Sequence, residues 1–135
     1  MPEATVAAIV TREGDPDTIL LTRRNGQPFK GMWCLPGGHI DPYETVQDAV
    51  IREVQEETHL DLEARFFGYF DEILPEHGIH AVVLVFCGPG RGQVRPQEAE
   101  VSEVRWCTAQ QAMSLPLAFD HRTILQAYAA HRQGG

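Results

Sequence analysis

The sequence predicts an α/β protein in which a mixed β-sheet lies between helices. Three observations lead to this prediction. Two strand-like runs with a turn between them open the chain, an amphipathic helical segment follows, and further strand-like runs precede two helical segments at the end. A chain of 135 residues can bury one core without disulfides or a structural metal, so we expect a single domain over residues 1–135.

The first half of the chain predicts a β-hairpin, a loop and a helix. Residues 5–10 (TVAAIV) and 18–23 (TILLTR) are rich in apolar and β-branched residues, and the turn-forming stretch REGDPD separates them. Residues 24–38 are dense in Gly and Pro, which indicates a loop that a short strand at Met32–Cys34 interrupts. We expect the helix to be capped by Asp41 and to end near Thr58.

The second half of the chain contains three strand patterns and two helix patterns. The run at 79–88 (IHAVVLVFCG) is so continuous in Val, Leu and Phe that we expect it to be a central strand. Thr108 and Asp120 are residues that favour helix N-caps. The full set of predicted elements is strands at 64–73, 79–88 and 101–106, a loop at 89–100, and helices at 109–113 and 121–132.

Charge and composition exclude several classes of protein. The formal net charge of −8 offers no basic stripe, so we expect no nucleic acid polymer as partner. The longest apolar run, Ala81–Cys87, is far shorter than the roughly 20 residues that span a bilayer, so we expect no membrane contact. No basic segment precedes the apolar start, which argues against a secretory signal and predicts a cytoplasmic protein. Three widely separated cysteines predict reduced thiols rather than disulfides.

The predicted helix carries acidic side chains on its apolar side. On a helical wheel Glu53 and Glu57 fall within about 20° of Val46, in the stripe that should face the core, and Glu56 lies at the edge of that stripe. The three carboxylates repel one another, and they stand in the last turns of the helix, where negative charge is disfavoured. A helix end emerging into solvent would explain them, but a bound Mg²⁺ or Mn²⁺ would remove both penalties.

The segment around these acids resembles the Nudix box of the Nudix hydrolase family. Residues 38–60 read GHIDPYETVQDAVIREVQEETHL, and the residues that match the family pattern in register are Gly38, Glu44, Arg52, Glu53, Val54, Glu56, Glu57 and Leu60. The exception is His59, which stands where the family usually has Gly. We expect His59 in a left-handed conformation at the helix end, at a cost of about 1 kcal/mol.

The resemblance implies a Nudix-type α/β/α sandwich and hydrolysis of a nucleoside diphosphate linked to another moiety, with Mg²⁺ or Mn²⁺. Carried over to this sequence, it assigns the metal to Glu53, Glu56, Glu57 and the carbonyl group of Gly38. It also implies a catalytic role for Glu56, and for Arg52 as the residue that fixes a catalytic glutamate. A surface ion pair is the alternative role of Arg52.

Outside the box the sequence offers further candidates. Family members often recruit an acid from the region before the last strand, and Glu100 is our choice for a catalytic acid there. Arg23, Arg24 and Lys30 precede the glycines of the box and could meet substrate phosphates, although a solvated loop explains them nearly as well.

The substrate is the least determined feature of the sequence. Residues 115–125 (LPLAFDHRTIL) and Pro75 resemble the ADP-ribose pyrophosphatase-like branch of the family, which predicts ADP-ribose or a related nucleotide sugar. The alternatives are a nucleoside triphosphate pyrophosphohydrolase, including one for oxidised nucleotides, and a non-catalytic nucleotide-binding Nudix-fold module. The expected partner is a small nucleotide. The sequence leaves open whether the protein forms a homodimer, as family members often do.

Overall fold

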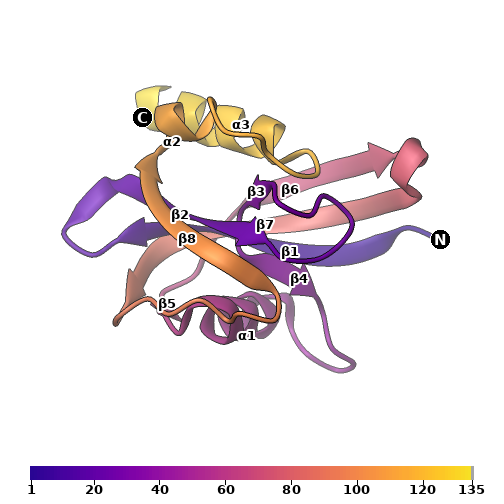
Figure 1. Ribbon diagram of the computed structural model, residues 1–135, viewed down its shortest axis with the longest axis horizontal. Helices are drawn as coiled ribbons and strands as arrows, with labels where there is room; N and C mark the ends of the chain where they lie inside the picture. Colours follow the sequence, from indigo (N-terminus) through magenta and orange to yellow (C-terminus); the bar gives the residue numbers. More distant parts are fainter. Residues whose placement is uncertain (135) are drawn as a thin grey trace.

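The computed structural model describes residues 1–134 and has one eight-stranded β-sheet between helices (Figure 1). Helix α1 covers one face of the sheet, and helices α2 and α3 lie on the other. The elements are β1 (Glu3–Arg12), β2 (Asp15–Arg24), β3 (Trp33–Cys34), β4 (Gly37–His39), α1 (Val46–Thr58), β5 (Asp61–Leu62), β6 (Arg65–Leu74), the 3₁₀ turn η1 (Pro75–His77), β7 (Ile79–Arg91), β8 (Val101–Thr108), α2 (Ala109–Ala112) and α3 (His121–Gly134). The predicted α/β class with a mixed sheet is confirmed.

Strands β1 and β7 form the centre of the sheet and run parallel, from Glu3 opposite Ala81 to Arg12 opposite Gly90. Strands β5 and β6 pair antiparallel with β7, and β3 and β8 pair antiparallel with β2. The predicted hairpin of β1 and β2 is confirmed, but these strands pair only near the turn, because the rest of β1 pairs with β7 and with β4. Strand β4 is not predicted from the sequence, because its residues Gly37, Gly38 and His39 have no strand preference.

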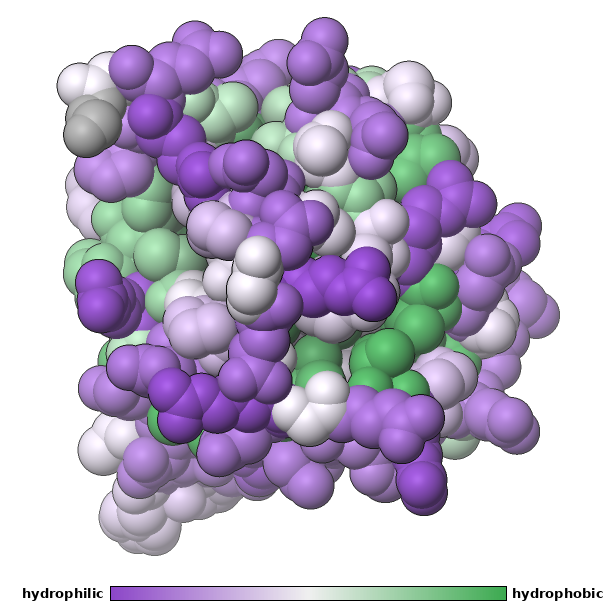
Figure 2. Space-filling view, turned by 90° about the vertical axis from the view of Figure 1, so that its left-hand side faces the viewer, coloured by the Kyte–Doolittle hydropathy of each residue, from purple (hydrophilic) through white to green (hydrophobic). Residues whose placement is uncertain are grey.

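The two faces of the central strands bury different residues, as strand alternation requires. The face covered by α1 and the face covered by α3 each have a continuous apolar cluster, whereas the surface in Figure 2 is mainly hydrophilic. Each fully buried Val, Leu or Ile contributes about 1.5–3 kcal/mol to stability. The α1 cluster contains Val6, Ala8, Val10, Leu20, Ala49, Val50 and Val54, and the α3 cluster contains Ala7, Ile9, Ile19, Leu21, Ile124, Leu125 and Tyr128.

Helix α1 begins later than predicted. Its N-cap is Thr45, whose Oγ1 accepts a hydrogen bond from the backbone N–H of Asp48 at 3.1 Å. The predicted cap, Asp41, is wrong, because Tyr43 has a φ of 67° and keeps the preceding residues out of the helix. Glu44 therefore lies in the loop, where its Oε1 accepts a hydrogen bond from the backbone N–H of Asp41 at 3.0 Å.

The ends of the other helices agree with the predictions. His59 follows α1 with a φ of 64°, and its N–H donates to the carbonyl oxygen of Gln55, so the expected left-handed conformation is confirmed. Thr108 caps α2, and α3 begins directly after Asp120. All three cysteines are free, as expected. Among the described residues, every helix is too short or too polar to cross a membrane.

Candidate functional site

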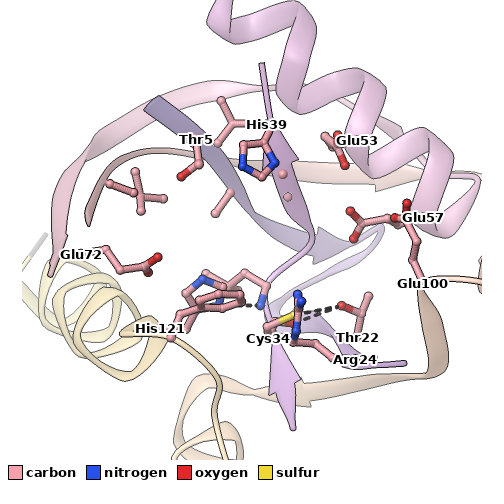
Figure 3. A pocket seen from close by; sticks show the side chains of 18 of the residues that line it. Thr5, Thr22, Arg24, Cys34, His39, Glu53, Glu57, Glu72, Glu100 and His121 are labelled. Carbon is pink, nitrogen blue, oxygen red and sulfur yellow. Dashed lines mark hydrogen bonds between the residues drawn. The ribbon is translucent and has the colours of Figure 1, made fainter. Parts of the chain in front are cut away.

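A cleft of about 490 Å³ opens beside the centre of the sheet (Figure 3). Its walls come from α1, β1, β4, β6, β7, the start of α3 and the loop before β8, so the two helical layers and the sheet all contribute to it. Figure 3 shows three glutamates on one side of the cleft and the side chains of Glu72 and His121 at another part of its wall.

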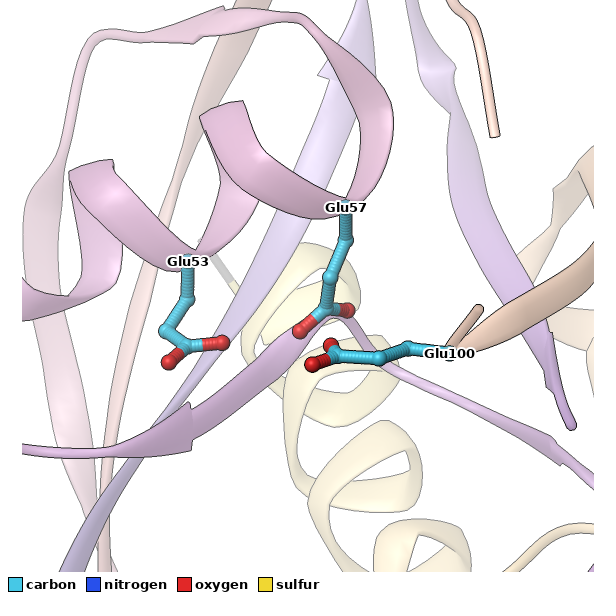
Figure 4. A group of neighbouring side chains, drawn as sticks. All are labelled: Glu53, Glu57 and Glu100. Carbon is cyan, nitrogen blue, oxygen red and sulfur yellow. The ribbon is translucent and has the colours of Figure 1, made fainter. Parts of the chain in front are cut away.

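The three glutamates on one side of the cleft are Glu53, Glu57 and Glu100. Each offers one carboxylate oxygen, and these three oxygens lie within 4.8 Å of one another (Figure 4). Glu53 and Glu57 stand one turn apart on α1, as the helical wheel predicts, and Glu57 is only 6% exposed. This acidic cluster therefore combines residues from the helix and from a loop more than forty positions later in the chain.

Backbone hydrogen bonds fix the loop that brings Glu100 to the helix. The last carbonyl groups of an α-helix lack partners within the helix. In α1 the carbonyl oxygen of Thr58 accepts from the N–H of Arg95 at 2.8 Å, and that of Glu57 accepts from the N–H of Gln97 at 2.9 Å. The N–H of Glu100 then donates to the carbonyl oxygen of Gln97 at 3.1 Å. The end of α1 thus positions Glu100.

The electrostatics of the acidic cluster are unfavourable without a cation. Burial raises the pKa of Glu57 well above its usual value, and the neighbouring carboxylates of Glu53 and Glu100 raise it further. A divalent cation prefers several carboxylate oxygens, and it would relieve this repulsion. The geometry of the three oxygens and the burial of Glu57 therefore both fit a divalent metal site.

Arg52 holds Glu53 in place through hydrogen bonds to several parts of the chain. Its Nη1 donates to Glu53 Oε1 at 2.9 Å, and its Nη2 donates to the carbonyl oxygen of His39 at 3.0 Å. Its Nε and Nη2 also donate to the two carboxylate oxygens of Glu44, at 2.8 Å and 3.0 Å. The hydrogen bond from Arg52 lowers the pKa of Glu44, which stays ionised. The guanidinium group therefore joins α1, β4 and the loop before α1.

Glycines in β4 leave the room that this arrangement needs. A Cβ atom on Gly38 would lie 2.7 Å from the carboxylate of Glu53, and one on Gly37 would lie 2.1 Å from the carbonyl oxygen of Val6. A side chain at Gly38 would displace the Glu53 carboxylate, and a side chain at Gly37 would push β4 away from β1. Gly38 lines the cleft beside Glu53.

Glu56 does not belong to the acidic cluster. Its carboxylate is 53% exposed and accepts a hydrogen bond from Arg52 Nη1 at 3.2 Å. The structure thus brings together two of the three predicted glutamates of α1, together with Glu100. The roles of Glu56 in metal binding and catalysis stay predictions.

Of the three basic residues predicted to meet substrate phosphates, only Arg24 lines the cleft. Its Nε donates to the carbonyl oxygen of Pro28 at 2.7 Å, and its guanidinium group lies 4.8 Å from the ring centre of Phe119. Arg23 is outside the cleft lining and pairs with Glu103 at 3.5 Å, and Lys30 is exposed.

Two buried polar residues of the cleft were missed in the sequence analysis. Glu72 and His121 are each only 6% exposed, and both line the cleft. The helical period could have predicted His121, because it begins the buried stripe that continues with Ile124 and Leu125 on α3. Glu72 stands two positions after Phe70 on β6, on the strand face that turns toward α3.

Residues 1–128 match the NUDIX domain family. The chain is 31% identical over 140 residues to the ADP-ribose pyrophosphatase of Methanocaldococcus jannaschii, covering 98% of this chain and 76% of that protein. It is 32% identical over 136 residues to the CTP pyrophosphohydrolase of Escherichia coli, covering 94% and 91% of the two chains. It superimposes on the NUDIX domain of NrtR from Shewanella oneidensis, solved in complex with ADP ribose, with a TM-score of 0.84 and 26% identity, covering 97% and 88% of the two chains.

The fold, the acidic cluster and these similarities agree with one another. Nudix hydrolases use divalent metal ions, and this chain has an acidic cluster that can hold one. The chain belongs to the NUDIX domain family and is a Nudix hydrolase, a pyrophosphohydrolase.

Proposed function

We propose that this protein hydrolyses the pyrophosphate bond of ADP-ribose or a related nucleotide sugar with Mg²⁺ or Mn²⁺. The observation that carries the proposal is the acidic cluster of Glu53, Glu57 and Glu100 at one end of a 490 Å³ cleft, which continues past the cluster and leaves space for the rest of a nucleotide. The similarity to an ADP-ribose pyrophosphatase favours this substrate class. Residues 1–135 would act as one catalytic domain.

The proposed metal ligands are the carboxylates of Glu53, Glu57 and Glu100 and the carbonyl group of Gly38. A divalent cation supplies charge stabilisation to diphosphate oxygens and lowers the pKa of a water molecule. Arg52 keeps the Glu53 carboxylate pointing into the cleft through its 2.9 Å hydrogen bond. Glu56 would have to turn away from Arg52 to act as a further ligand.

Glu100 is the acid that we assign to the attacking water. Glu57 is buried, and Glu53 is held by Arg52, so neither is free to turn toward a water molecule. Glu100 is exposed and belongs to a loop. One carboxylate oxygen of Glu100 would bind the metal ion, and the other would accept the proton of the water molecule, which a general base has to reach.

Arg24 is the residue that we assign to the substrate phosphates. Among the residues that line the cleft in the described part of the chain, Arg24 is the only Arg or Lys. A protein with a net charge of −8 needs a local positive charge to attract a diphosphate. Arg24 and a bound metal ion would supply that charge at neighbouring parts of the cleft.

The similarity to a CTP pyrophosphohydrolase favours a second candidate function, the hydrolysis of a nucleoside triphosphate to a monophosphate and pyrophosphate. The two activities require the same acidic cluster and differ in what occupies the rest of the cleft.

The test is a product analysis by ion-exchange chromatography with Mg²⁺ or Mn²⁺ and a panel of ADP-ribose, sugar nucleotides, NAD, CTP and other nucleoside triphosphates. The wild type should convert ADP-ribose or a sugar nucleotide to two monophosphates, and Glu57→Gln should lower kcat by orders of magnitude. Glu76→Gln is the matched control, because Glu76 is exposed on η1 and outside the cleft. Turnover of triphosphates alone would favour the second candidate. Nucleotide binding without any turnover would refute both enzymatic candidates.

A further inference from the structure

The cleft has a second group of polar residues away from the acidic cluster. Glu72 comes from β6 and His121 from the first turn of α3 (Figure 3). The two are neighbours in space, because the N–H of Asp120, the residue before His121, donates to Glu72 Oε2 at 3.5 Å. Apolar side chains surround them in the lining of the cleft, including Leu35, Ile79, Ala81, Val83 and Phe119.

His121 presents a hydrogen-bond donor to the cleft. Its Nδ1 accepts a hydrogen bond from the backbone N–H of Leu35 at 3.0 Å, so Nδ1 carries no proton. Burial and, to a smaller extent, the charge of Arg24 lower the pKa of His121 to about 4, so the ring is neutral at neutral pH. A neutral ring with a bare Nδ1 carries its proton on Nε2.

The Nε2 atom of His121 is open to a ligand. Within residues 1–134 it makes no hydrogen bond to protein. Every side-chain nitrogen or oxygen in this range that is fully shielded from solvent has a hydrogen-bond partner, so Nε2 must be in contact with solvent. His121 lines the cleft, so the cleft is where this N–H is accessible. A ligand that fills the cleft would take the place of water at this N–H and would have to offer it an acceptor.

Glu72 presents an acceptor beside this donor. Its Oε2 receives only the long hydrogen bond from Asp120, and its Oε1 has no hydrogen bond to the described residues. Burial raises the pKa of Glu72, which reflects how little water reaches the carboxyl group. A glutamate that is only 6% exposed and has an open oxygen selects a ligand that donates a hydrogen bond.

The surroundings select the kind of ligand. A donor and an acceptor in the same part of the cleft complement the Watson–Crick edge of a nucleobase, which offers an acceptor next to a donor. The apolar side chains around them suit the faces of a flat ring. A sugar carries hydroxyl groups around its whole ring, and most of them would lose hydrogen bonds against these walls.

We propose that Glu72 and His121 form a subsite that binds the hydrogen-bonding edge of the substrate's nucleobase. The proposal rests on the proposed function, because it places the base of the nucleotide in the same cleft in which the acidic cluster meets the diphosphate. His121 Nε2–H donates to the acceptor of the base, and Glu72 accepts from the neighbouring donor. The other moiety of the substrate then extends from the acidic cluster toward solvent.

The test measures binding rather than turnover. Titration calorimetry with Mg²⁺ compares AMP, CMP, GMP and UMP with ribose 5-phosphate, which lacks a base. At least one nucleotide should bind the wild type roughly tenfold or more tightly than ribose 5-phosphate. Glu72→Gln keeps one oxygen to accept from Asp120 N–H and places an amide N–H, which cannot accept, at the other position. His121→Asn keeps an acceptor for Leu35 N–H but removes the Nε2 donor. Each should remove most of the difference without changing the affinity for ribose 5-phosphate.

Two further variants separate binding from structure. Glu76→Gln removes an exposed carboxylate outside the cleft and should bind every probe like the wild type. His121→Gln restores a donor near the Nε2 position but loses the acceptor for Leu35 N–H. It should therefore unfold at a lower temperature than His121→Asn and yet retain more of the preference for the nucleotide.

A measurement on the wild type alone covers the case in which a variant does not fold. In protein labelled with ¹⁵N, the Nε2 resonance of His121 should shift on addition of the preferred nucleotide and stay in place with ribose 5-phosphate. A wild type that binds all nucleotides like ribose 5-phosphate, or a preference that survives both Glu72→Gln and His121→Asn, would overturn the proposal. If the wild type hydrolyses no nucleotide substrate but still binds a nucleotide more tightly than ribose 5-phosphate, the proposed function is wrong and the base subsite is still supported.

Discussion

Replacing Glu57 by Gln should make the metal-free protein more stable. The buried Glu57 carboxyl group faces Glu53 and Glu100, with one oxygen of each within 4.8 Å. Gln has nearly the same shape but no charge, so it keeps the packing and removes the repulsion. The same change should abolish activity, because an amide is a poor ligand for a hard divalent cation.

The size of the gain follows from the distances. Two unit charges 4.8 Å apart repel by about 3 kcal/mol at an effective dielectric constant near 20. Glu100 is exposed, so water screens its share, and partial protonation of Glu57 relieves some of the repulsion from Glu53. We therefore expect a gain of about 1–3 kcal/mol at pH 8. For a chain of 135 residues this raises the Tm by roughly 3–4 °C per kcal/mol.

The pH dependence of the gain has a definite sign. Because the pKa of Glu57 is raised in the folded protein, the folded state binds more protons than the unfolded state between the two pKa values. The wild type therefore loses stability as the pH rises through the raised pKa, and it has no such loss below the pKa of an unfolded Glu. The advantage of Glu57→Gln should be largest at high pH and should vanish near pH 4.

The assay is thermal unfolding followed by circular dichroism, with EDTA and then with MgCl₂. Glu56→Gln is the control, since its exposed ion pair with Arg52 is worth less than about 1 kcal/mol. Metal should stabilise the wild type and leave Glu57→Gln unchanged, because only a folded site binds it. A lower Tm for Glu57→Gln than for the wild type in EDTA at pH 8 would refute the reasoning.

Three further predictions concern Arg52, Gly38 and His121. Arg52→Lys keeps the charge but cannot join Glu53 to the carbonyl group of His39. Steady-state kinetics should therefore show kcat lowered roughly 10- to 100-fold with little change in KM. An unchanged kcat would contradict this role of Arg52. Gly38→Ala displaces the Glu53 carboxylate, and we expect a similar loss of kcat with a Tm within about 3 °C of the wild type. If the fraction of folded protein fell as much as the activity did, the effect would not be local to the site. The pKa of His121 falls from 6.5 to about 4 on folding, so its ring becomes charged in the folded protein only near pH 4. As the pH is lowered from 6.5 through 4, the wild type should therefore lose about 3 kcal/mol of unfolding free energy relative to His121→Asn. Urea denaturation at several pH values measures this, and an equal dependence of the unfolding free energy on pH in the two proteins would exclude it.

The acids of α1 could be predicted because a helix has a regular period. The wheel places Glu53 and Glu57 in line with the apolar stripe and Glu56 at its edge, and in the structure the first two face the cleft while Glu56 turns to Arg52. The position of Glu100 followed from the resemblance and from its place before the last strand. Its spatial neighbours depend on hydrogen bonds between the loop and the end of α1, which no local pattern encodes.

The errors have physical causes as well. Asp41 and Thr45 are both good N-cap residues, and only the backbone at Tyr43 and the hydrogen bonds of Glu44 decide between them. Arg23 and Arg24 are adjacent in sequence, but alternation along β2 sends just one of them into the cleft. Glu72 is an acid in a predicted strand, and such a residue is expected on the surface. Its place on the inward face becomes clear only when the elements that pack against the strand are known.

The parallel pairing of β1 with β7 has a consequence for the order of folding. Glu3 pairs with Ala81, so the centre of the sheet cannot form until most of the chain has been synthesised. Closing such a long loop costs entropy before any contact repays it, and proteins rich in distant pairings fold slowly. Until β7 emerges from the ribosome, the apolar residues of β1 have only the tip of β2 and the short strand β4 as partners, which makes the nascent chain prone to aggregation. A fragment ending after α1 would carry Glu53 and Glu57 but lack the strand that completes the sheet beneath them.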